Sequence, residues 1–212
     1  MLIAPKTYIS NVIQKLQLEI HPKMINGLRG IIPGGISVQD FSAVTKINAN
    51  DSKIILDEFI KNDVGSKQEN SYYFEDGDKL KIAISLLEKG YPIDEISIVL
   101  NWRDFEGLTA ALLSEKNFAV MKNLMLTKPR MEIDVVGIRL GIAILIDCKH
   151  WKRYSTSALS TAVKKQIERT KQYVEKAPGA MAVPVIVTLY QDKIDFIDNV
   201  RIVPSFQFAS FI

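Results

Sequence analysis

The chain has 212 residues, of which 47% are apolar and 24% charged, so it can bury a core and fits one large or two small domains. Its net charge of +3 is compatible with a polyanionic partner but does not identify one. The single cysteine, Cys148, excludes an internal disulfide and a cysteine zinc cluster, and no apolar run approaches the roughly 20 residues that a membrane helix requires. We therefore expect a cytoplasmic protein with no membrane partner and two domains, residues 1–91 and 92–212.

The first domain is predicted to be mostly helical. Apolar residues recur at helical spacing over residues 7–20 and again over 24–30, and the segment 31–35 has the composition of a turn. Ser37 with Asp40 three residues later has the pattern of a helix N-cap, and Asn50 is expected to cap the following helix.

These two short helices, joined by residues 48–50, resemble a helix-turn-helix. Residues 71–74 are predicted to form a strand, as in a wing, and a last helix is expected to open at residues 76–78 and to stop at 89–90. The domain is therefore expected to be winged-helix-like. Acidic residues are interleaved with its lysines, so positioning on DNA, dimerisation and packing against the second domain all stay open.

The second domain changes its pattern. A helix is predicted over 102–115, strands over 119–126, 133–138 and 142–148, a long polar helix over 157–176, and a buried strand over 182–189. The tail is expected to add an edge strand and a closing segment. This αβββαβ order predicts an α/β fold, with a mixed central sheet flanked by helices rather than a doubly wound sheet.

Two acids and an amine are expected to meet on a hairpin of this sheet. The turn between residues 137 and 141 makes the two strands antiparallel, and Asp134 and Asp147 are almost equally far from it. Asp147 and Lys149 are two positions apart and share one face, whereas Cys148 points to the other. Glu132 lies on the same face as Asp134, in either a supporting or a surface role.

This arrangement predicts metal chemistry. Two adjacent carboxylates repel each other unless a cation lies between them, and oxygen ligands suit Mg²⁺ or Mn²⁺. The carbonyl of Cys148 is a further candidate ligand. A metal so bound activates a water molecule and neutralises charge on a phosphate, while the Lys149 ammonium stabilises the same charge or orients the nucleophile. The expected reaction is phosphodiester hydrolysis.

Three segments, residues 102–106, 132–136 and 147–151, resemble the PD-(D/E)XK nuclease superfamily. They are similar to Mrr-type restriction endonucleases, archaeal Holliday-junction resolvases and related archaeal nucleases with an added N-terminal domain. The resemblance covers about residues 93–189 and implies that Glu106, Asp134 and Asp147 are metal ligands and that Lys149 is the catalytic lysine. Gln166 resembles a glutamine that several such families carry beside the site. The proline that names the motif is replaced by Ile133.

The resulting hypothesis is a Mg²⁺-dependent DNA endonuclease, with a homodimer as a possible assembly because such enzymes often pair two sites. The alternative is a non-catalytic DNA-binding or regulatory protein that keeps a nuclease-like fold, and action on RNA also stays open. The segment 150–154 mixes cations with aromatic rings, as expected where a nucleic-acid backbone meets stacking platforms. The cations of the polar helix, Arg169 among them, are interleaved with acids and are interpreted as a solvated face.

Overall fold

The computed structural model describes residues 23–153, 155–190 and 194–212, and the chain divides into two compact units, Met1–Leu100 and Asn101–Ile212. The helix expected over residues 7–20 lies outside the described residues. The second unit begins at Asn101 rather than at residue 92, because a helix that sequence analysis did not predict, α5 (Ile93–Val99), packs against helices of the first unit.

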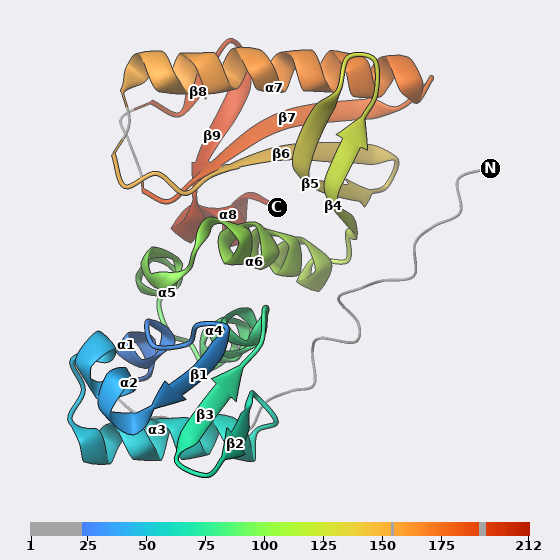
Figure 1. Cartoon of the computed structure of the whole chain (residues 1–212). Helices are drawn as coiled ribbons and strands as arrows, with labels where there is room; N and C mark the ends of the chain where they lie inside the picture. Colours follow the sequence, from blue (N-terminus) through green and yellow to red (C-terminus); the bar gives the residue numbers. More distant parts are fainter. Residues whose placement is uncertain (1–22, 154, 191–193) are drawn as a thin grey trace. The chain divides into compact units, whose positions relative to one another are not determined.

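The first unit combines helices with a small antiparallel sheet (Figure 1). Its other elements are α1 (Met24–Leu28), β1 (Gly34–Ser37), α2 (Val38–Thr45), α3 (Ala49–Lys61), β2 (Ser66–Gln68), β3 (Ser71–Phe74) and α4 (Asp78–Glu88). The strand order is β1-β3-β2, so β3 lies in the middle. Fully buried side chains of α2, α3 and α4, including Phe41, Phe59 and Ile82, fill the core under the sheet.

Two corrections concern this unit. The segment 31–35 is not only a turn, because Gly34 and Gly35 already pair with β3 in strand β1. The N-cap of α3 is Asn48 rather than Asn50: its backbone is extended and its side chain accepts a hydrogen bond from the amide of Asp51 at 2.9 Å. The predicted cap at Ser37 is confirmed by the hydrogen bond from the amide of Asp40.

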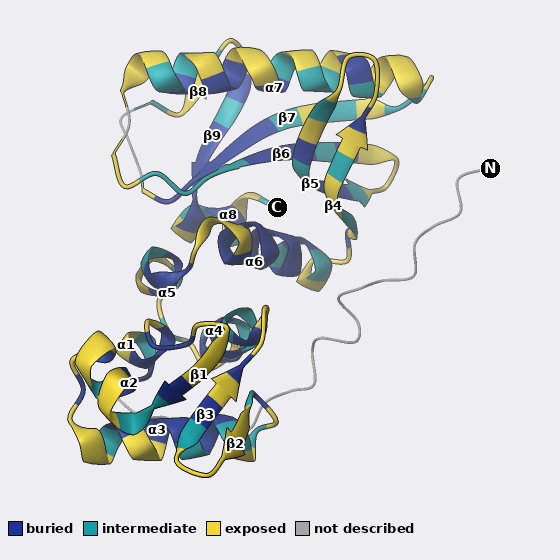
Figure 2. Ribbon diagram, viewed as in Figure 1, coloured by how far each residue is buried: buried dark blue, intermediate teal, exposed yellow. Residues whose placement is uncertain are grey.

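The second unit is a mixed six-stranded sheet between helices (Figures 1 and 2). Its elements are α6 (Trp102–Glu115), β4 (Ala119–Leu126), β5 (Met131–Arg139), β6 (Ile142–Lys149), α7 (Thr156–Lys176), β7 (Met181–Thr188), β8 (Phe196–Ile197), β9 (Val200–Pro204) and α8 (Ser205–Phe211). The strand order is β4-β5-β6-β7-β9-β8; β4 to β6 are antiparallel, and β7 and β9 run parallel to β6. The predicted order of elements from α6 to β7 is therefore present.

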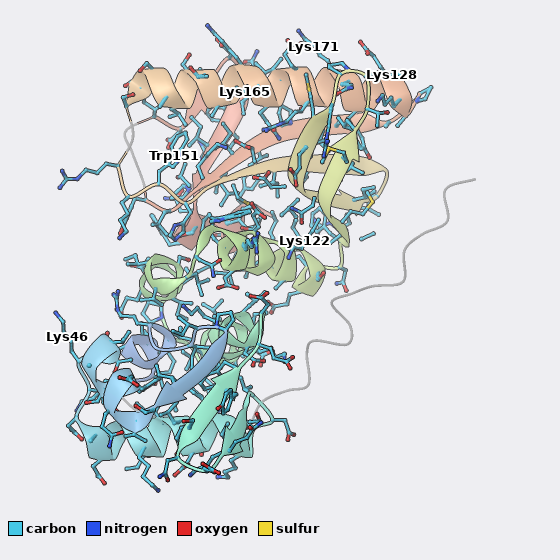
Figure 3. The ribbon with its side chains drawn as sticks, viewed as in Figure 1. Lys46, Lys122, Lys128, Trp151, Lys165 and Lys171 are labelled. Atoms are coloured by element: carbon cyan, nitrogen blue, oxygen red, sulfur yellow. The ribbon has the colours of Figure 1, made fainter. Side chains whose placement is uncertain are left out.

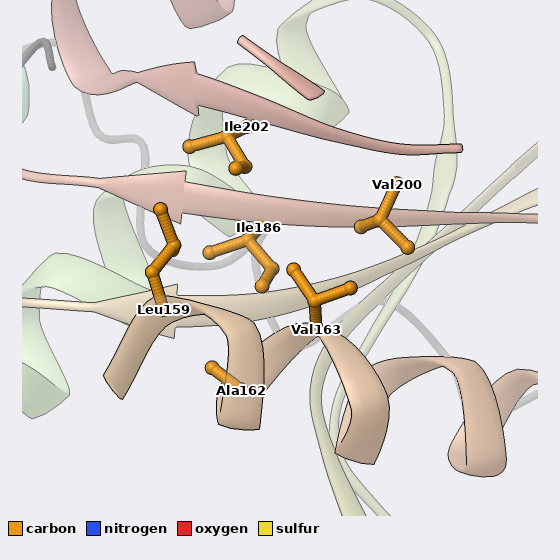
Figure 4. Close-up of a cluster of buried hydrophobic side chains, with 6 residues drawn as sticks. All are labelled: Leu159, Ala162, Val163, Ile186, Val200 and Ile202. Carbon is orange, nitrogen blue, oxygen red and sulfur yellow. The ribbon is translucent and has the colours of Figure 1, made fainter. Parts of the chain in front are cut away.

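The tail does more than add an edge. Strand β9 inserts between β7 and the short edge strand β8, and α8 then packs on β7, β9 and α6. Helix α7 covers the opposite face, where Leu159, Ala162 and Val163 meet Ile186, Val200 and Ile202 (Figure 4). Burial of these six side chains fixes α7 along the sheet, with its polar side exposed to solvent (Figure 2).

The hairpin between β5 and β6 sets the register of the site. Only Leu140 and Gly141 form its turn, both with positive φ, and Arg139 pairs with Ile142. A two-residue turn of this kind matches the twist of the strands and leaves no freedom in their pairing. The fully apolar segment that precedes Asp147 thus lies in the middle of the sheet and brings this acid to a defined position.

Candidate active site

Asp134 and Asp147 end the paired part of strands β5 and β6. Val135 pairs with Ile146, so the two acids are the next opposed positions. Beyond Val135, a side chain takes part in the contact between the two strands: the backbone amide of Cys148 donates a hydrogen bond to Oδ2 of Asp134 at 2.7 Å. Directly opposed residues of an antiparallel pair share one face of the sheet. The hairpin therefore brings together the two aspartates that sequence analysis selected.

Asp147 is buried and held by two cations. Its side chain is 1% exposed; Nζ of Lys149 lies 2.7 Å from Oδ2, and Nη1 of Arg169 lies 2.7 Å from Oδ1. Oδ2 accepts no hydrogen bond of good geometry, so its contact with Lys149 is an ion pair that leaves a lone pair unused. A buried charge needs such partners, because desolvation alone would make it costly.

Glu106 lies in the second turn of α6 and is 7% exposed. Asn101 begins this helix, since its side chain accepts a hydrogen bond from the amide of Asp104 at 2.9 Å. Burial is the main cause that raises the pKa of Glu106 to about 7, the charge of Asp134 is the next cause, and Lys122 opposes the shift. Glu106 is therefore close enough to the aspartate pair for mutual repulsion.

Asp134 is also difficult to ionise. Burial raises its pKa to about 6, with the charge of Asp147 as the next cause, and the amide of Cys148 and the cations of Lys149 and Arg169 act in the opposite direction. Two acids with raised pKa values beside a third buried carboxylate form an acidic centre whose negative charge is not balanced by the chain itself. Such centres are typical of functional sites.

Gln166 is fully buried on α7, and its Nε2 donates to the carbonyl of Leu145 at 2.7 Å. Its Oε1 lies 3.3 Å from Nη1 of Arg169, which also reaches Asp147. Both ends of the amide are thus used inside the protein, so Gln166 supports β6 and orients Arg169.

Sequence analysis placed Arg169 on a solvated face, and this interpretation is wrong for that residue. The signal that could have found it is the spacing, because a residue three positions after a sheet-facing glutamine flanks the same side of the helix.

The residues next to Lys149 contact aromatic rings and α6. The ring of Trp151 lies 5.5 Å from Nζ of Lys149, and His150 packs edge-on against Phe105 with ring centroids 5.4 Å apart. Sγ of Cys148 lies 3.6 Å from Oγ1 of Thr109 on α6, so this side chain points away from Asp147, as alternation predicts. Tyr154, at the end of the segment of cations and aromatic rings, lies outside the described residues.

The acids of the site meet some of the needs of a divalent cation. Among the residues described, no three His, Cys, Asp or Glu side chains gather closely enough to hold an ion, so Glu106 is not assembled with the aspartates into one ligand shell. Mg²⁺, however, is usually bound by one or two carboxylates, with water and phosphate oxygens completing its shell. The opposed aspartates and the unused Oδ2 lone pair of Asp147 fit that requirement.

Comparisons with known proteins give weak similarities. No protein-family model matches the chain. An uncharacterized protein of Archaeoglobus fulgidus is 29% identical over 117 residues, which are 53% of this chain and 90% of that protein. VC1899 from Vibrio cholerae aligns with 88% of this chain at 10% identity and a TM-score of 0.45. Can2 from Sulfobacillus thermosulfidooxidans, solved in complex with cyclic tetra-adenylate, aligns with 74% at 15% identity and a TM-score of 0.36.

The chain spans 48% of VC1899 and 42% of Can2, less than half of either protein. Similarities at this level leave the assignment of function to the chemistry of the site. Within the part of the chain that the structure describes, no helix is long and apolar enough to cross a membrane.

Proposed function

We propose that the protein is a metal-dependent nuclease that hydrolyses phosphodiester bonds of DNA. The observation that carries the proposal is the cluster at the ends of β5 and β6. There Asp134 and Asp147 are opposed across the hairpin, and Lys149 lies 2.7 Å from Asp147. Buried acids with raised pKa values beside a lysine are costly for a fold, and the cost is explained if a cation and a phosphate complete the arrangement.

Asp134 and Asp147 would hold the divalent ion, Mg²⁺ or Mn²⁺, with the carbonyl of Cys148 as a further candidate ligand, whereas Glu106 would act from outside this shell. When bound, the ion would supply an activated water molecule and charge neutralisation on the phosphate. Each carboxylate contributes an oxygen of the hardness that these ions prefer.

The chain's own cations have separate parts in the proposal. The ammonium of Lys149, held beside Asp147 and near the ring of Trp151, is available to stabilise the negative charge that develops on the phosphate. Arg169 holds Asp147 from the other side, so that this carboxylate keeps one orientation. Gln166 acts through Arg169 and β6 and is a positioning residue rather than a group that touches substrate.

For the first unit we propose a role in holding or orienting DNA. The proposal is supported by the unit's order of elements from α1 to β3, in which α2 and α3 are consecutive helices, as in a helix-turn-helix, and β2 and β3 form a hairpin, as expected of a wing. On α3, Lys53 is exposed but bonded to Asp57, so this helix is not strongly basic. Dimerisation through this unit is the second role that we propose for it.

One observation favours a non-catalytic nucleic-acid-binding protein instead. Asp147 already has two cations, Lys149 and Arg169, both at 2.7 Å, and an acid neutralised in this way needs no metal ion. In that alternative the carboxylates and cations would be a buried network that stabilises the fold, and DNA would bind without being cut.

The two candidates are separated by a cleavage assay on plasmid, linear duplex and branched DNA with Mg²⁺ or Mn²⁺. Asp147→Asn should lower the rate at least about 100-fold, because it removes a charge from the centre that binds the ion and the phosphate. Asp134→Asn serves as a second variant, since loss of a buried acid with two ion pairs can also unfold the protein.

Glu175→Gln is the matched control, because Glu175 is an exposed acid on α7 that lies outside the acidic centre. It should cleave at the wild-type rate. No cleavage of any substrate by the wild type or the variants, while DNA is still bound, would establish the non-catalytic alternative. Equal cleavage by the wild type and both aspartate variants would overturn the assignment of the active site.

A further inference from the structure

A cavity of about 450 Å³ lies between the start of β5 and the middle of α7. Seven side chains line it: Arg130, Met131, Glu132, Lys164, Lys165, Glu168 and Arg169. Four of these are cations and two are acids. Figure 3 labels Lys165 and Lys171, which both lie on α7. Because they are six positions apart, they extend from different sides of the helix.

The acids of the cavity have partners elsewhere. Glu168 pairs with Lys171 at 2.9 Å, and Glu132 accepts a hydrogen bond from Nδ2 of Asn123 at 3.0 Å. Of the four cations, only Arg169 has an ion-pair partner in the described part of the chain, namely Asp147. The cavity therefore has a surplus of positive charge, which is the requirement for holding an anion.

The walls of the cavity are fixed to each other. Nε2 of Gln172 on α7 donates to the carbonyls of Thr127 and Pro129, at 3.1 and 2.6 Å, and Lys176 also bonds to Thr127. These bonds tie the loop between β4 and β5 to the helix. A site whose walls are already held in place loses little entropy when it binds a ligand.

The cavity adjoins the candidate active site. Arg169 lines it and touches Asp147, and Glu132 lies two residues before Asp134 on the same strand. We propose that Arg130, Lys164 and Lys165 hold a backbone phosphate of the nucleic-acid strand, close to the phosphodiester bond that is cut. This inference rests on the proposed function, since it names a subsite for the same substrate. Guanidinium and ammonium groups converging on one cavity are the usual receptors for phosphate.

The test measures binding of fluorescent duplex and single-stranded oligonucleotides, with EDTA present so that no cleavage occurs. Lys164→Ala/Lys165→Ala should weaken binding about 5- to 10-fold and reduce the slope of log K against log salt by about 1 to 2. The control Lys89→Ala/Lys116→Ala removes the same charge from exposed positions outside the cavity and should stay within about twofold of wild type. Thermal melts confirm that each variant is folded.

The outcomes separate the possible sources of the phosphate. Weaker oligonucleotide binding in the cavity variant alone supports the proposal. Equal binding by wild type and both variants overturns it, as does an equal loss in the control. Competition with inorganic phosphate and adenosine monophosphate provides the other arm: if the cavity variant loses only the mononucleotide, the cavity serves a free phosphate ligand and the proposal is overturned.

The inference can fail separately from the proposed function. If the wild type cuts DNA and the cavity variant binds and cuts like it, only the cavity assignment is wrong. If no metal-dependent cleavage occurs but the binding difference is present, the cavity assignment holds and the nuclease proposal fails.

Discussion

The pKa shift of one surface acid, Asp57, is opposite to the shifts of two buried acids, Glu106 and Asp134. On α3, burial raises the pKa of Asp57, but hydrogen bonds from Tyr72, Lys67 and Lys53 outweigh it and lower the pKa to about 2. In the second unit, burial and mutual repulsion raise the pKa values of Glu106 and Asp134 to about 7 and about 6. Asp57 belongs to a surface network, the first group, in which three side chains donate hydrogen bonds to its carboxylate. Glu106, Asp134 and Asp147 form the second group, in which the nearby cations are too few to offset burial and repulsion at Glu106 and Asp134.

This difference in pKa shift indicates which acids stabilise the fold and which are suited to bind a ligand. The Asp57 network stabilises the ionised carboxylate without any external group, as expected of a structural contact between a helix and a hairpin. The ionised forms of the acids around Asp147 would be stabilised by an added cation, which is the behaviour expected of a cation-binding site. Variants that change one group and leave the other intact test this contrast.

The largest expected effect follows from removing the lysine of the second group. Lys149→Met should reduce DNA cleavage about 100-fold with little change in DNA affinity, because the ammonium is proposed to act on charge that develops during the reaction. The fold should survive, since Arg169 still neutralises Asp147.

Lys67→Met is the control for this variant, as it removes a lysine that lies 2.9 Å from Asp57 in the surface network. It should leave single-turnover cleavage unchanged. If both variants cleave like the wild type, Lys149 does not take part in catalysis, and the difference in pKa shift between the two groups does not mark an active site.

The next effect is a dependence of stability on pH. Glu106 has a pKa of about 7 in the folded protein against 4.5 ordinarily, so the folded state binds more protons between these values, and stability falls as pH rises from about 4.5 to about 7. Glu106→Gln removes this cost and should stabilise the protein by about 2 kcal/mol at pH 8, with almost no effect at pH 4.

Urea unfolding at both pH values measures this difference. Added Mg²⁺ should narrow it at pH 8, because an ion that binds only the folded wild type offsets the repulsion. If Glu106→Gln stabilises the protein equally at pH 4 and pH 8, ionisation of Glu106 does not destabilise the folded state.

The smallest effect is expected for the surface network. The pKa of Asp57 is lowered from 3.8 to about 2, so its stabilisation is present above pH 4 and is lost as pH falls through about 2. Asp57→Asn should cost only about 0.5 kcal/mol at pH 7, because solvent screens the half-exposed pairs with Lys53 and Lys67.

The cost of Asp57→Asn should disappear near pH 2 in thermal melts, and cleavage should be unaffected. A loss of more than about 3 kcal/mol in the free energy of unfolding would be the size expected for a buried ion pair. Such a loss would contradict the interpretation of Asp57 as part of a solvent-screened surface network.

Much of the second unit could be predicted from the sequence because its signals are local. The spacing of apolar residues gave α6, β4 and β6 within a residue of their observed bounds, and the turn at Leu140 and Gly141 set the register that opposes Asp134 and Asp147. Periodicity also placed Cys148 on the other side of β6. Such features depend only on how side chains alternate along one strand and on the conformations that a short turn allows.

Packing between distant elements was decided by the tertiary structure alone. The sequence did not show that β9 inserts beside β7, that α5 belongs to the first unit, or that Arg169 reaches Asp147 across 22 positions. It also could not give the raised pKa of Glu106, which depends on burial and on the charge of Asp134 on strand β5. The physical reason is that periodicity fixes the direction of a side chain from its own element, whereas its partner and its dielectric surroundings depend on which elements pack together.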